Sequence, residues 1–334
     1  MRRCFNLMLL IPAMVIVGCS KEAPNGSVAG SEGNAERKLR IAVIPKGTTH
    51  EFWKSGEAGA RKAGEELGVE IIWKGPQRES DRSGQLNVVE NFITQSVDGI
   101  ALAPLDEKAL VRPVKEAATA GIKVAVWDSG LDDSAGDAVI SFVATDNFHA
   151  GEECGRRLAD LLGGKGKVIM LRHAVGHAST TKRAEGFLSG IKKAAPEIEL
   201  VSVDQRGGTS IDEAIKTSEN LLNQFGDSIQ GVFTPNESTT QGMLRALDEA
   251  GLAGKVAFIG FDTNDALLDA LREKKIAALA VQDPFRMGYT VVKNIVSAIK
   301  GEAFEAQVDT GAVLLDLDNI DSEKIRKLLR KPAN

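Results

Sequence analysis

The sequence predicts an α/β protein built from two doubly wound, Rossmann-like domains with parallel sheets. Three observations support this prediction. Short apolar runs alternate with longer amphipathic segments along nearly the whole chain. The short runs are apolar at successive positions, which is typical of parallel strands covered by helices on both faces. The length of 334 residues is sufficient for two domains with sizeable cores.

Two successive series of strands and helices follow from this pattern. In the first, strands are expected at 39–45, 69–75, 99–105 and 123–129, with helices at about 50–67, 81–95 and up to 120. In the second, strands are expected at 139–146, 167–173, 199–204, 231–235, 255–262 and 276–283, again with helices between them. The chain then shows a helical pattern at about 286–300, a strand at 310–317 and a short helix at 321–330. The pattern alone assigns these last three elements to neither domain.

The N-terminus indicates export and attachment to a membrane. Arg2 and Arg3 precede an apolar stretch, 5–17, that is too short to span a bilayer comfortably and fits a signal peptide over residues 1–18. The following Cys19 completes a sequence that resembles a bacterial lipobox, which implies cleavage before Cys19 and its lipidation. Residues 19–38 are polar and rich in Gly and Ser, so we expect a flexible tether.

Charge and cysteine content exclude several classes of protein. The formal charge is −5 and basic residues are not clustered, so a nucleic-acid partner is not expected. Cys4 leaves with the signal peptide and Cys19 is taken by lipid, so Cys154 has no partner for an intrachain disulfide. We expect Cys154 to be a small buried apolar residue.

Aromatic, acidic and amide side chains cluster where the predicted strands end. In open parallel sheets, ligands bind beyond the carboxyl ends of the strands. Neither GxGxxG after a strand nor GxxxxGK[ST] is present, so no nucleotide cofactor is expected. Carboxylates accept hydrogen bonds from vicinal hydroxyls, amides both donate and accept, and rings cover C–H faces. These residue types favour a small polyhydroxylated ligand.

Eight segments carry a resemblance to a known family. They are IAVIPKGTTHEFWKSGEAGARKAGEELG, DGIALAPLDEKAL, GIKVAVWDSG, ATDNFHAGE, KRAEGF, GVFTPNE, FIGFDTND and VQDPFRMG. In this order and spacing, the chain from Leu39 to Asn334 resembles the periplasmic sugar-binding proteins of ABC transporters, in the ribose/galactose-binding family. The resemblance implies a type I binding protein whose two lobes close on a monosaccharide-like ligand about a three-segment hinge. It also implies a monomer that serves an ABC permease, without catalysis and without a cofactor.

The same resemblance gives the domain boundaries and the site. The lobes would comprise 39–145 with about 283–311, and 146–282 with about 312–334, with crossings near 145–146, 282–283 and 309–312. Ligand contacts transferred from the family's motifs fall on His50, Phe52, Trp53, Asp128, Arg183, Asn236, Asp262 and Gln282.

Two positions depart from the ribose-binding pattern. Ser129 stands where ribose binders have Arg, and Thr209 stands where a stacking aromatic is expected. The N-terminal half is also similar to autoinducer-2-binding proteins, which adds Lys46 as a contact. The ligand is therefore left open between sugars and autoinducer-2, and the partner between an ABC permease and a chemoreceptor or sensor kinase.

Structural roles compete with binding roles at several of these residues. Phe52 and Trp53 lie at a helix start and point about 100° apart, so we expect Trp53 to stack on the ligand and Phe52 to be partly structural. Trp127 is expected in the core, and Asp262 has the alternative of capping a helix. His173 and His177 have a metal-like spacing, but no third ligand is evident; we expect histidines at the surface or cleft rim, and no metal site.

The sequence does not indicate two other classes of protein. A glycosidase would need two carboxylates at a fixed separation, and no such motif is present. A transcriptional regulator that shares this sensor fold would need an N-terminal DNA-binding helix pair, where this chain has a signal peptide and a tether.

Overall fold

The first strand, β1 (Arg40–Ile44), shows why the sheets have no exposed face. Ile41 and Val43 point into one apolar cluster, whereas Ala42 and Ile44 point into another, and all four are fully buried. A strand whose successive residues are all apolar can be buried only between two layers of helices. The computed structural model describes residues 37–329, and the residues from Lys38 onward belong to one compact unit.

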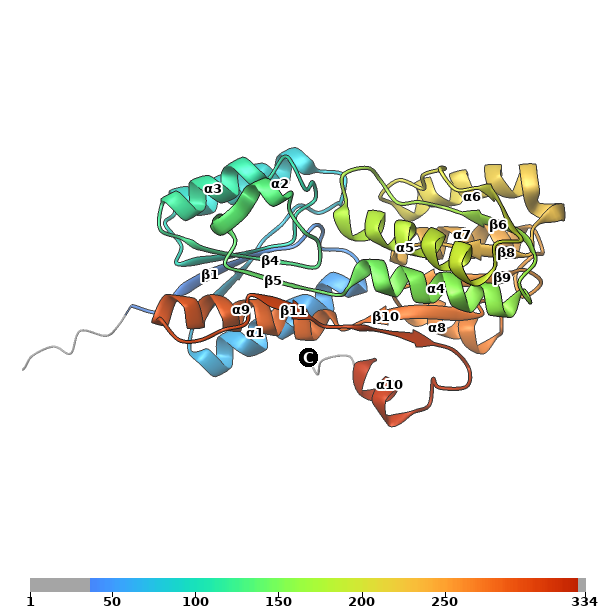
Figure 1. Cartoon of the computed structure of the whole chain (residues 1–334). Coiled ribbons are helices and arrows are strands. Elements are labelled where there is room, and N and C mark those ends of the chain that lie inside the picture. The colour runs from blue at the N-terminus through green and yellow to red at the C-terminus, as the bar shows by residue number, and fades with distance from the viewer. Residues whose placement is uncertain (1–36, 330–334) are drawn as a thin grey trace, which may run out of the picture. The chain divides into compact units, whose positions relative to one another are not determined.

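Six strands form the first sheet, in the order β11-β5-β4-β3-β1-β2, and every pair in it is parallel. Its remaining strands are β2 (Glu70–Trp73), β3 (Gly99–Leu102), β4 (Lys123–Trp127), β5 (Ser141–Ala144) and β11 (Gln307–Asp309). Helices α1 (Glu51–Leu67) and α9 (Pro284–Lys300) pack on one face of this sheet. Helices α2 (Arg82–Thr94) and α3 (Val111–Thr119) cover the other, as Figure 1 shows. A short 3₁₀ segment, η1 (Asp133–Ala138), precedes β5.

Six further strands form the second sheet, in the order β12-β10-β9-β8-β6-β7. These strands are β6 (Gly166–Met170), β7 (Ile198–Ser202), β8 (Gly231–Phe233), β9 (Ala257–Phe261), β10 (Ala278–Gln282) and β12 (Ala312–Leu315). All neighbours are parallel except β12, which runs antiparallel to β10.

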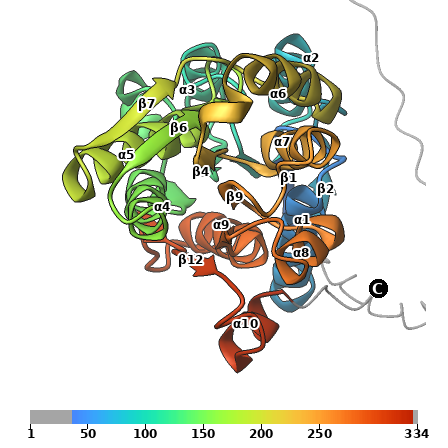
Figure 2. The same ribbon diagram turned by 90° about the vertical axis from the view of Figure 1, so that its right-hand side faces the viewer.

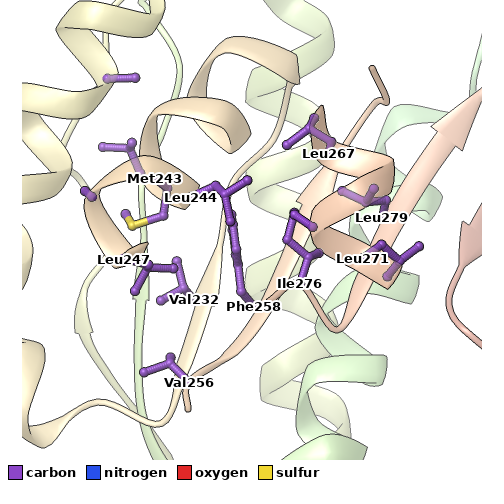
Figure 3. Close-up of a cluster of buried hydrophobic side chains, with 14 of the residues drawn as sticks. Val232, Met243, Leu244, Leu247, Val256, Phe258, Leu267, Leu271, Ile276 and Leu279 are labelled. Atoms are coloured by element: carbon purple, nitrogen blue, oxygen red, sulfur yellow. The ribbon is translucent and has the colours of Figure 1, made fainter. Parts of the chain in front are cut away.

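The helices of the second sheet also lie on both of its faces, as Figure 2 shows. One layer consists of α4 (Asn147–Leu161) and α5 (Ala178–Ala194). The other consists of α6 (Ile211–Phe225), α7 (Glu237–Glu249) and α8 (Asp265–Arg272), with η2 (Gly226–Ser228) after α6. Figure 3 shows the side chains that fill this second layer, and α10 (Glu323–Leu328) contributes Ile325 to the same cluster.

The chain passes between the two sheets at three places. It leaves the first sheet after β5, returns to it after β10, and leaves it again between β11 and β12. Two of these crossings are hydrogen-bonded side by side: Thr310 N donates to Ala144 O at 2.9 Å, and Asp146 N donates to Asp309 Oδ1 at 3.0 Å. The last elements of the chain are thus divided, with α9 and β11 on the first sheet and β12 on the second.

The predicted fold class, two doubly wound α/β domains, is confirmed, with small differences at element ends. The strand expected at 139–146 ends at Ala144, because Asp146 caps α4 by accepting a hydrogen bond from His149 N at 3.0 Å. β11 was not predicted; it has three residues and only one of them is buried. Cys154 is buried and unpaired, as expected. In the part of the chain that the structure describes, no helix has the length and apolar character needed to cross a membrane.

Candidate functional site

Two aspartates occupy equivalent places at the carboxyl ends of the two sheets. Asp128 follows β4 and Asp262 follows β9, and both have a positive φ, of 62° and 67°. This conformation is uncommon for a residue with a side chain and costs about 1–3 kcal/mol. The backbone N–H groups remain in the sheets, on Val143 O and Ala280 O. The turn therefore directs each carboxylate away from its strand, beyond the edge of the sheet.

A buried cavity of about 30 Å³ lies between the two sets of strand ends. The first half of the chain lines it with Lys46, His50, Phe52, Trp53, Glu79 and Asp128. The second half lines it with His177, Ser179, Thr180, Arg183, Asn236, Glu237, Asp262 and Gln282. This volume holds roughly two water molecules. The structure brings all the expected contact residues to this cavity except Ser129, which is buried beside it.

Lys46 and Ser129 join the two sides of the cavity. Lys46 Nζ lies 2.6 Å from Asp128 Oδ2 and donates a hydrogen bond to Ser179 Oγ at 3.0 Å. Ser129 Oγ accepts a hydrogen bond from Ser179 N at 3.1 Å. The start of α5 is therefore fastened to strand ends of the other sheet by two side chains, so Ser129 acts here as a contact between the two halves.

Arg183 is buried at the second sheet with its planar group fixed on three sides. Its Nε donates to Asn147 Oδ1 at 2.7 Å, and Nη1 donates to Pro235 O at 3.0 Å. The guanidinium lies 4.0 Å from the centre of the Phe261 ring, in a cation–π geometry. α5 carries Arg183 close to α4 because Gly151 leaves room: a Cβ at Gly151 would lie 2.1 Å from Arg183 O.

Asp262 is held by hydrogen bonds that leave it facing Arg183. Gln282 Nε2 donates to its Oδ1 at 2.7 Å and Glu237 N donates to its Oδ2 at 3.1 Å, while Arg183 Nη1 lies 3.8 Å from Oδ2. Burial raises the pKa of Asp262, and the charge of Arg183 offsets part of that rise. Asp262 does not cap α8, because Asn264 does so by accepting from Leu267 N; Asp262 instead accepts from Glu237 N, the first residue of α7.

Glu79 was not predicted from the sequence, yet it organises the first half of the site. Trp53 Nε1 donates to Glu79 Oε1 at 2.7 Å, and His50 Nδ1 lies 3.3 Å from the same oxygen. Burial alone would lower the pKa of His50, but the hydrogen bond and charge of Glu79 outweigh it and raise that pKa to about 9. Burial would raise the pKa of Glu79, but His50 holds it well below the usual range. The two groups form an ion pair at neutral pH.

The two aromatic residues of the first turn differ in their burial. Trp53 is only 3% exposed and packs edge to face on Trp127, with ring centres 5.3 Å apart, inside the core of the first sheet. Phe52 is half-buried and also lines the cavity. The indole N–H of Trp53 is occupied by Glu79, so stacking of Trp53 on a ligand stays a prediction, and Phe52 has the more accessible ring. Trp127 lies in the core, as expected.

Some residues that line the cavity carry a buried donor or acceptor atom that lacks a hydrogen-bond partner in the described part of the chain. Arg183 Nη2, Glu237 Oε2 and Gln282 Oε1 are buried and have no hydrogen-bond partner among residues 37–329. Leaving such a group unsatisfied costs about 1–3 kcal/mol. Donors and acceptors are thus available together, as a ligand carrying several hydroxyl groups requires. Asn236 differs, because its amide donates to Ser238 Oγ and its carbonyl oxygen accepts from Thr239.

His173 and His177 are not surface or cleft-rim residues, and that expectation is wrong: they are 2% and 0% exposed. Their rings meet edge to face with centres 4.5 Å apart. The sequence did not reveal a third group beside the two histidines. In the structure this group is Glu79, whose Oε2 lies 3.7 Å from His173 Nε2. One ligand atom from each of these three residues lies within 4.8 Å of the others, which a metal ion would require.

Thr209 lies outside the central cavity. It lines a wider groove of about 770 Å³ at the mouth of the cleft, together with His50, Glu79 and Glu237. Its backbone N–H donates to Glu213 Oε2 at 2.9 Å, within the capping box that begins α6. At the position where the ribose-binding pattern has a stacking aromatic residue, this chain therefore has Thr209, which lies beside the groove just before α6.

Comparison with known proteins gives a consistent result along most of the chain. A family model described as a periplasmic binding protein domain matches residues 41–303. The D-ribose/D-allose-binding protein of Pseudomonas aeruginosa is 29% identical over 307 residues, covering 90% of this chain and 93% of the relative. The D-allose-binding periplasmic protein of Escherichia coli is 30% identical over 264 residues, covering 78% and 84%.

Solved structures show the same similarity. A carbohydrate transporter solute-binding protein from Agrobacterium radiobacter in complex with D-arabinose has 35% identity and a TM-score of 0.84, covering 89% of this chain and 100% of that one. An ABC transporter solute-binding protein from Agrobacterium vitis with bound D-fucose has 33% identity and a TM-score of 0.83, covering 87% and 100%.

Proposed function

The chain belongs to the periplasmic binding proteins, in the ribose/galactose-binding family of ABC-transporter sugar-binding proteins with the type I fold, and from this premise we propose that it captures a monosaccharide or a closely related polyol in the cavity between its two sheets. The observation that carries the proposal is the set of unpaired buried donors and acceptors, Arg183 Nη2, Glu237 Oε2 and Gln282 Oε1, around one cavity.

The charges around the cavity support a neutral ligand. Cationic Lys46, His50 and Arg183 face the carboxylates of Glu79, Asp128, Glu237 and Asp262. Burial raises the pKa of Glu237 as well as that of Asp262, so neither carboxylate is favoured by its surroundings as a free one would be in water. A site with balanced charges gains little from an ionic ligand. It gains much from hydroxyl groups that complete its hydrogen bonds, and it rejects analogues that lack them.

The identity of the sugar is the open part of the proposal. Ribose, allose, arabinose and fucose are named for the relatives and are the first candidates. Ser129 and Thr209 depart from the ribose-binding pattern, and Ser129 is engaged with Ser179. Because Lys46 lines the cavity, autoinducer-2 uptake is the second candidate function.

Ligand entry requires the two sheets to separate, because a cavity of about 30 Å³ is smaller than any sugar. We assign the lobes to 39–145 with 283–311 and to 146–282 with 312–334. The three crossings would then act as a hinge about which the lobes close on the ligand. A lobe arrangement that depends on occupancy is the signal that an ABC permease, or a chemoreceptor, would read.

The protein is an extracytoplasmic solute-binding protein, and lipid attachment at Cys19 is our further proposal. Residues 1–36, with the signal peptide, Cys19 and most of the tether, lie outside the described part of the chain. The support is the lipobox-like sequence that ends at Cys19. Metabolic labelling with a fatty acid, compared between wild type and Cys19→Ser, tests the anchor; label retained by Cys19→Ser would contradict it. We further expect the protein to work as a monomer.

A thermal-shift screen tests the binding function. Pentoses, hexoses, polyols and autoinducer-2 are each added over a range of concentrations. A ligand at about 100 times its Kd stabilises the folded protein by about 2.7 kcal/mol, so the melting temperature rises measurably. A hit that Asp262→Asn weakens supports the site. The proposal fails if no sugar or polyol stabilises the protein, or if the best hit is unaffected by Asp262→Asn; stabilisation by autoinducer-2 alone would establish the second candidate.

A further inference from the structure

A buried group of one carboxylate and two imidazoles lies beside the ligand cavity. Glu79 comes from the segment between β2 and α2, His173 follows β6, and His177 caps the start of α5. All three are buried, and their nearest ligand atoms lie within 4.8 Å of one another. Glu79 uses Oε1 for Trp53 and His50, whereas Oε2 faces His173 Nε2 at 3.7 Å.

The ring nitrogens of both histidines are available. Nδ1 and Nε2 of His173 and of His177 are buried, and none of the four has a hydrogen-bond partner among the described residues. An imidazole normally satisfies at least one nitrogen when it is buried. A neutral imidazole has one nitrogen lone pair that it can offer to a cation, and no side chain of the described residues occupies that position on either ring.

We propose that Glu79, His173 and His177 bind a divalent transition metal ion of the zinc type. Two imidazoles and one carboxylate are a set that zinc accepts in tetrahedral sites with an open fourth position. Such ligand atoms lie about 2.0–2.2 Å from zinc, so the three groups must approach one another by small side-chain rotations. Magnesium and calcium prefer oxygen ligands and do not suit this set.

The charges around the group allow a cation. Lys46, His50, Arg82 and Arg183 are the positive groups that act on the two histidines. Asp128 pairs with Lys46, Asp106 with Arg82, Asp262 with Arg183 and Glu79 with His50. Each neighbouring positive charge is thus matched by a carboxylate, and Glu79 would be shared between His50 and the metal.

The ion would connect the two halves of the protein. Glu79 belongs to the part of the chain that forms the first sheet, whereas His173 and His177 belong to the second. All three ligands meet only when the two sheets are close together, as they are in this structure. Metal binding would therefore favour the closed arrangement, and by linkage a ligand that requires closure would bind more tightly in the presence of the metal.

Equilibrium dialysis tests the site directly. The protein, purified without a histidine tag and stripped with a chelator, is dialysed against Zn²⁺ or Mg²⁺, and bound metal is measured by atomic emission. We expect about one zinc per chain and no magnesium. Glu79→Gln and His177→Ala should each weaken zinc binding at least tenfold. His149→Ala, at an exposed histidine on α4 with 63% of its side chain accessible, should bind zinc as wild type does.

Two results would contradict the zinc site. Absence of zinc binding in wild type overturns the proposal, and so does equal binding by wild type, Glu79→Gln and His177→Ala, which would place the ion elsewhere. Circular dichroism verifies that each variant is folded, and His173→Gln replaces any variant that is not. Sugar-induced stabilisation is measured on the same metal-free wild type. A failure of the metal proposal can therefore be distinguished from a failure of the sugar-binding proposal.

Discussion

The ammonium group of Lys46 lies 2.6 Å from a carboxylate oxygen of Asp128, with the two side chains 3% and 5% exposed. The same ammonium group reaches across the cavity to Ser179 Oγ. An ion pair this well buried gains Coulomb energy but has lost the hydration of both charges. Its principal effect is therefore seen when one partner is removed and the other charge remains without compensation.

Replacing Lys46 by methionine should destabilise the protein strongly. Methionine keeps much of the length and apolar character of the lysine stem but leaves Asp128 buried without its cation, which costs about 3–5 kcal/mol. Urea unfolding followed by circular dichroism measures the loss. The double variant Lys46→Met/Asp128→Asn removes both charges and should recover a large part of the stability. A single variant as stable as wild type would show that the pair does not matter for folding.

Asp262→Asn should abolish or greatly weaken ligand-induced stabilisation while the protein stays folded. The amide preserves the volume, but its single oxygen can accept from only one of Gln282 Nε2 and Glu237 N, and the charge that faces Arg183 is lost. Calorimetry with the best sugar of the screen measures the change in Kd. The matched control is Asp265→Asn, three residues on and exposed on α8. Undiminished binding in Asp262→Asn removes this residue from the site.

Arg183 is not suited to replacement by alanine. Its guanidinium fastens α5 to Asn147 and Pro235 O, so Arg183→Ala would leave several buried groups unpaired and should lower stability by a few kcal/mol. Arg183→Lys keeps the charge but not the planar fork. We expect it to fold and to bind sugar more weakly, as measured by thermal shift and calorimetry; sugar affinity equal to wild type would contradict a ligand contact.

The local sequence pattern was sufficient to predict the architecture, but not to predict which side chains are buried. Runs such as 40–44 are apolar at every position, and that pattern predicts strands buried on both faces. β11 was not predicted, because Gln307, Val308 and Asp309 do not form an apolar run. Only their pairing with β5 makes them a strand.

The candidate site was predictable where a residue follows a strand directly and not where a loop brings it in. Asp128 and Asp262 end strands, so their position follows from topology. Glu79 lies in a long polar segment in which any of several charged residues would look equivalent. His173 and His177 appeared exposed because Gly176 and a strand end are nearby, but the neighbouring half of the chain covers them. Burial between two halves is a long-range property that short sequence patterns do not contain.

Cys154 should be unreactive in the native protein. It is fully buried, and burial raises the pKa of its thiol to about 12, so the reactive thiolate is scarce below that pH. The difference in labelling by a thiol reagent between wild type and Cys154→Ser isolates this residue from Cys4 and Cys19. We expect no difference at pH 8 in buffer and one thiol per chain in urea. Rapid native labelling of Cys154 would mean that α4 opens far more often than its packing implies.

Close packing of α4 against α5 should be essential for the position of Arg183. A Cβ at Gly186 would lie 2.0 Å from Phe148 O, so alanine there must push the two helices apart. Such overpacking costs about 1–3 kcal/mol and would move Arg183, one turn earlier on α5, relative to Asp262. We expect Gly186→Ala to lower both the free energy of unfolding and the affinity for the sugar. Glu185→Ala, at an exposed residue of the same helix that pairs with Lys182, should change neither by more than a few tenths of a kcal/mol. Equal behaviour of the two variants would show that the α4–α5 contact tolerates expansion and does not position the arginine.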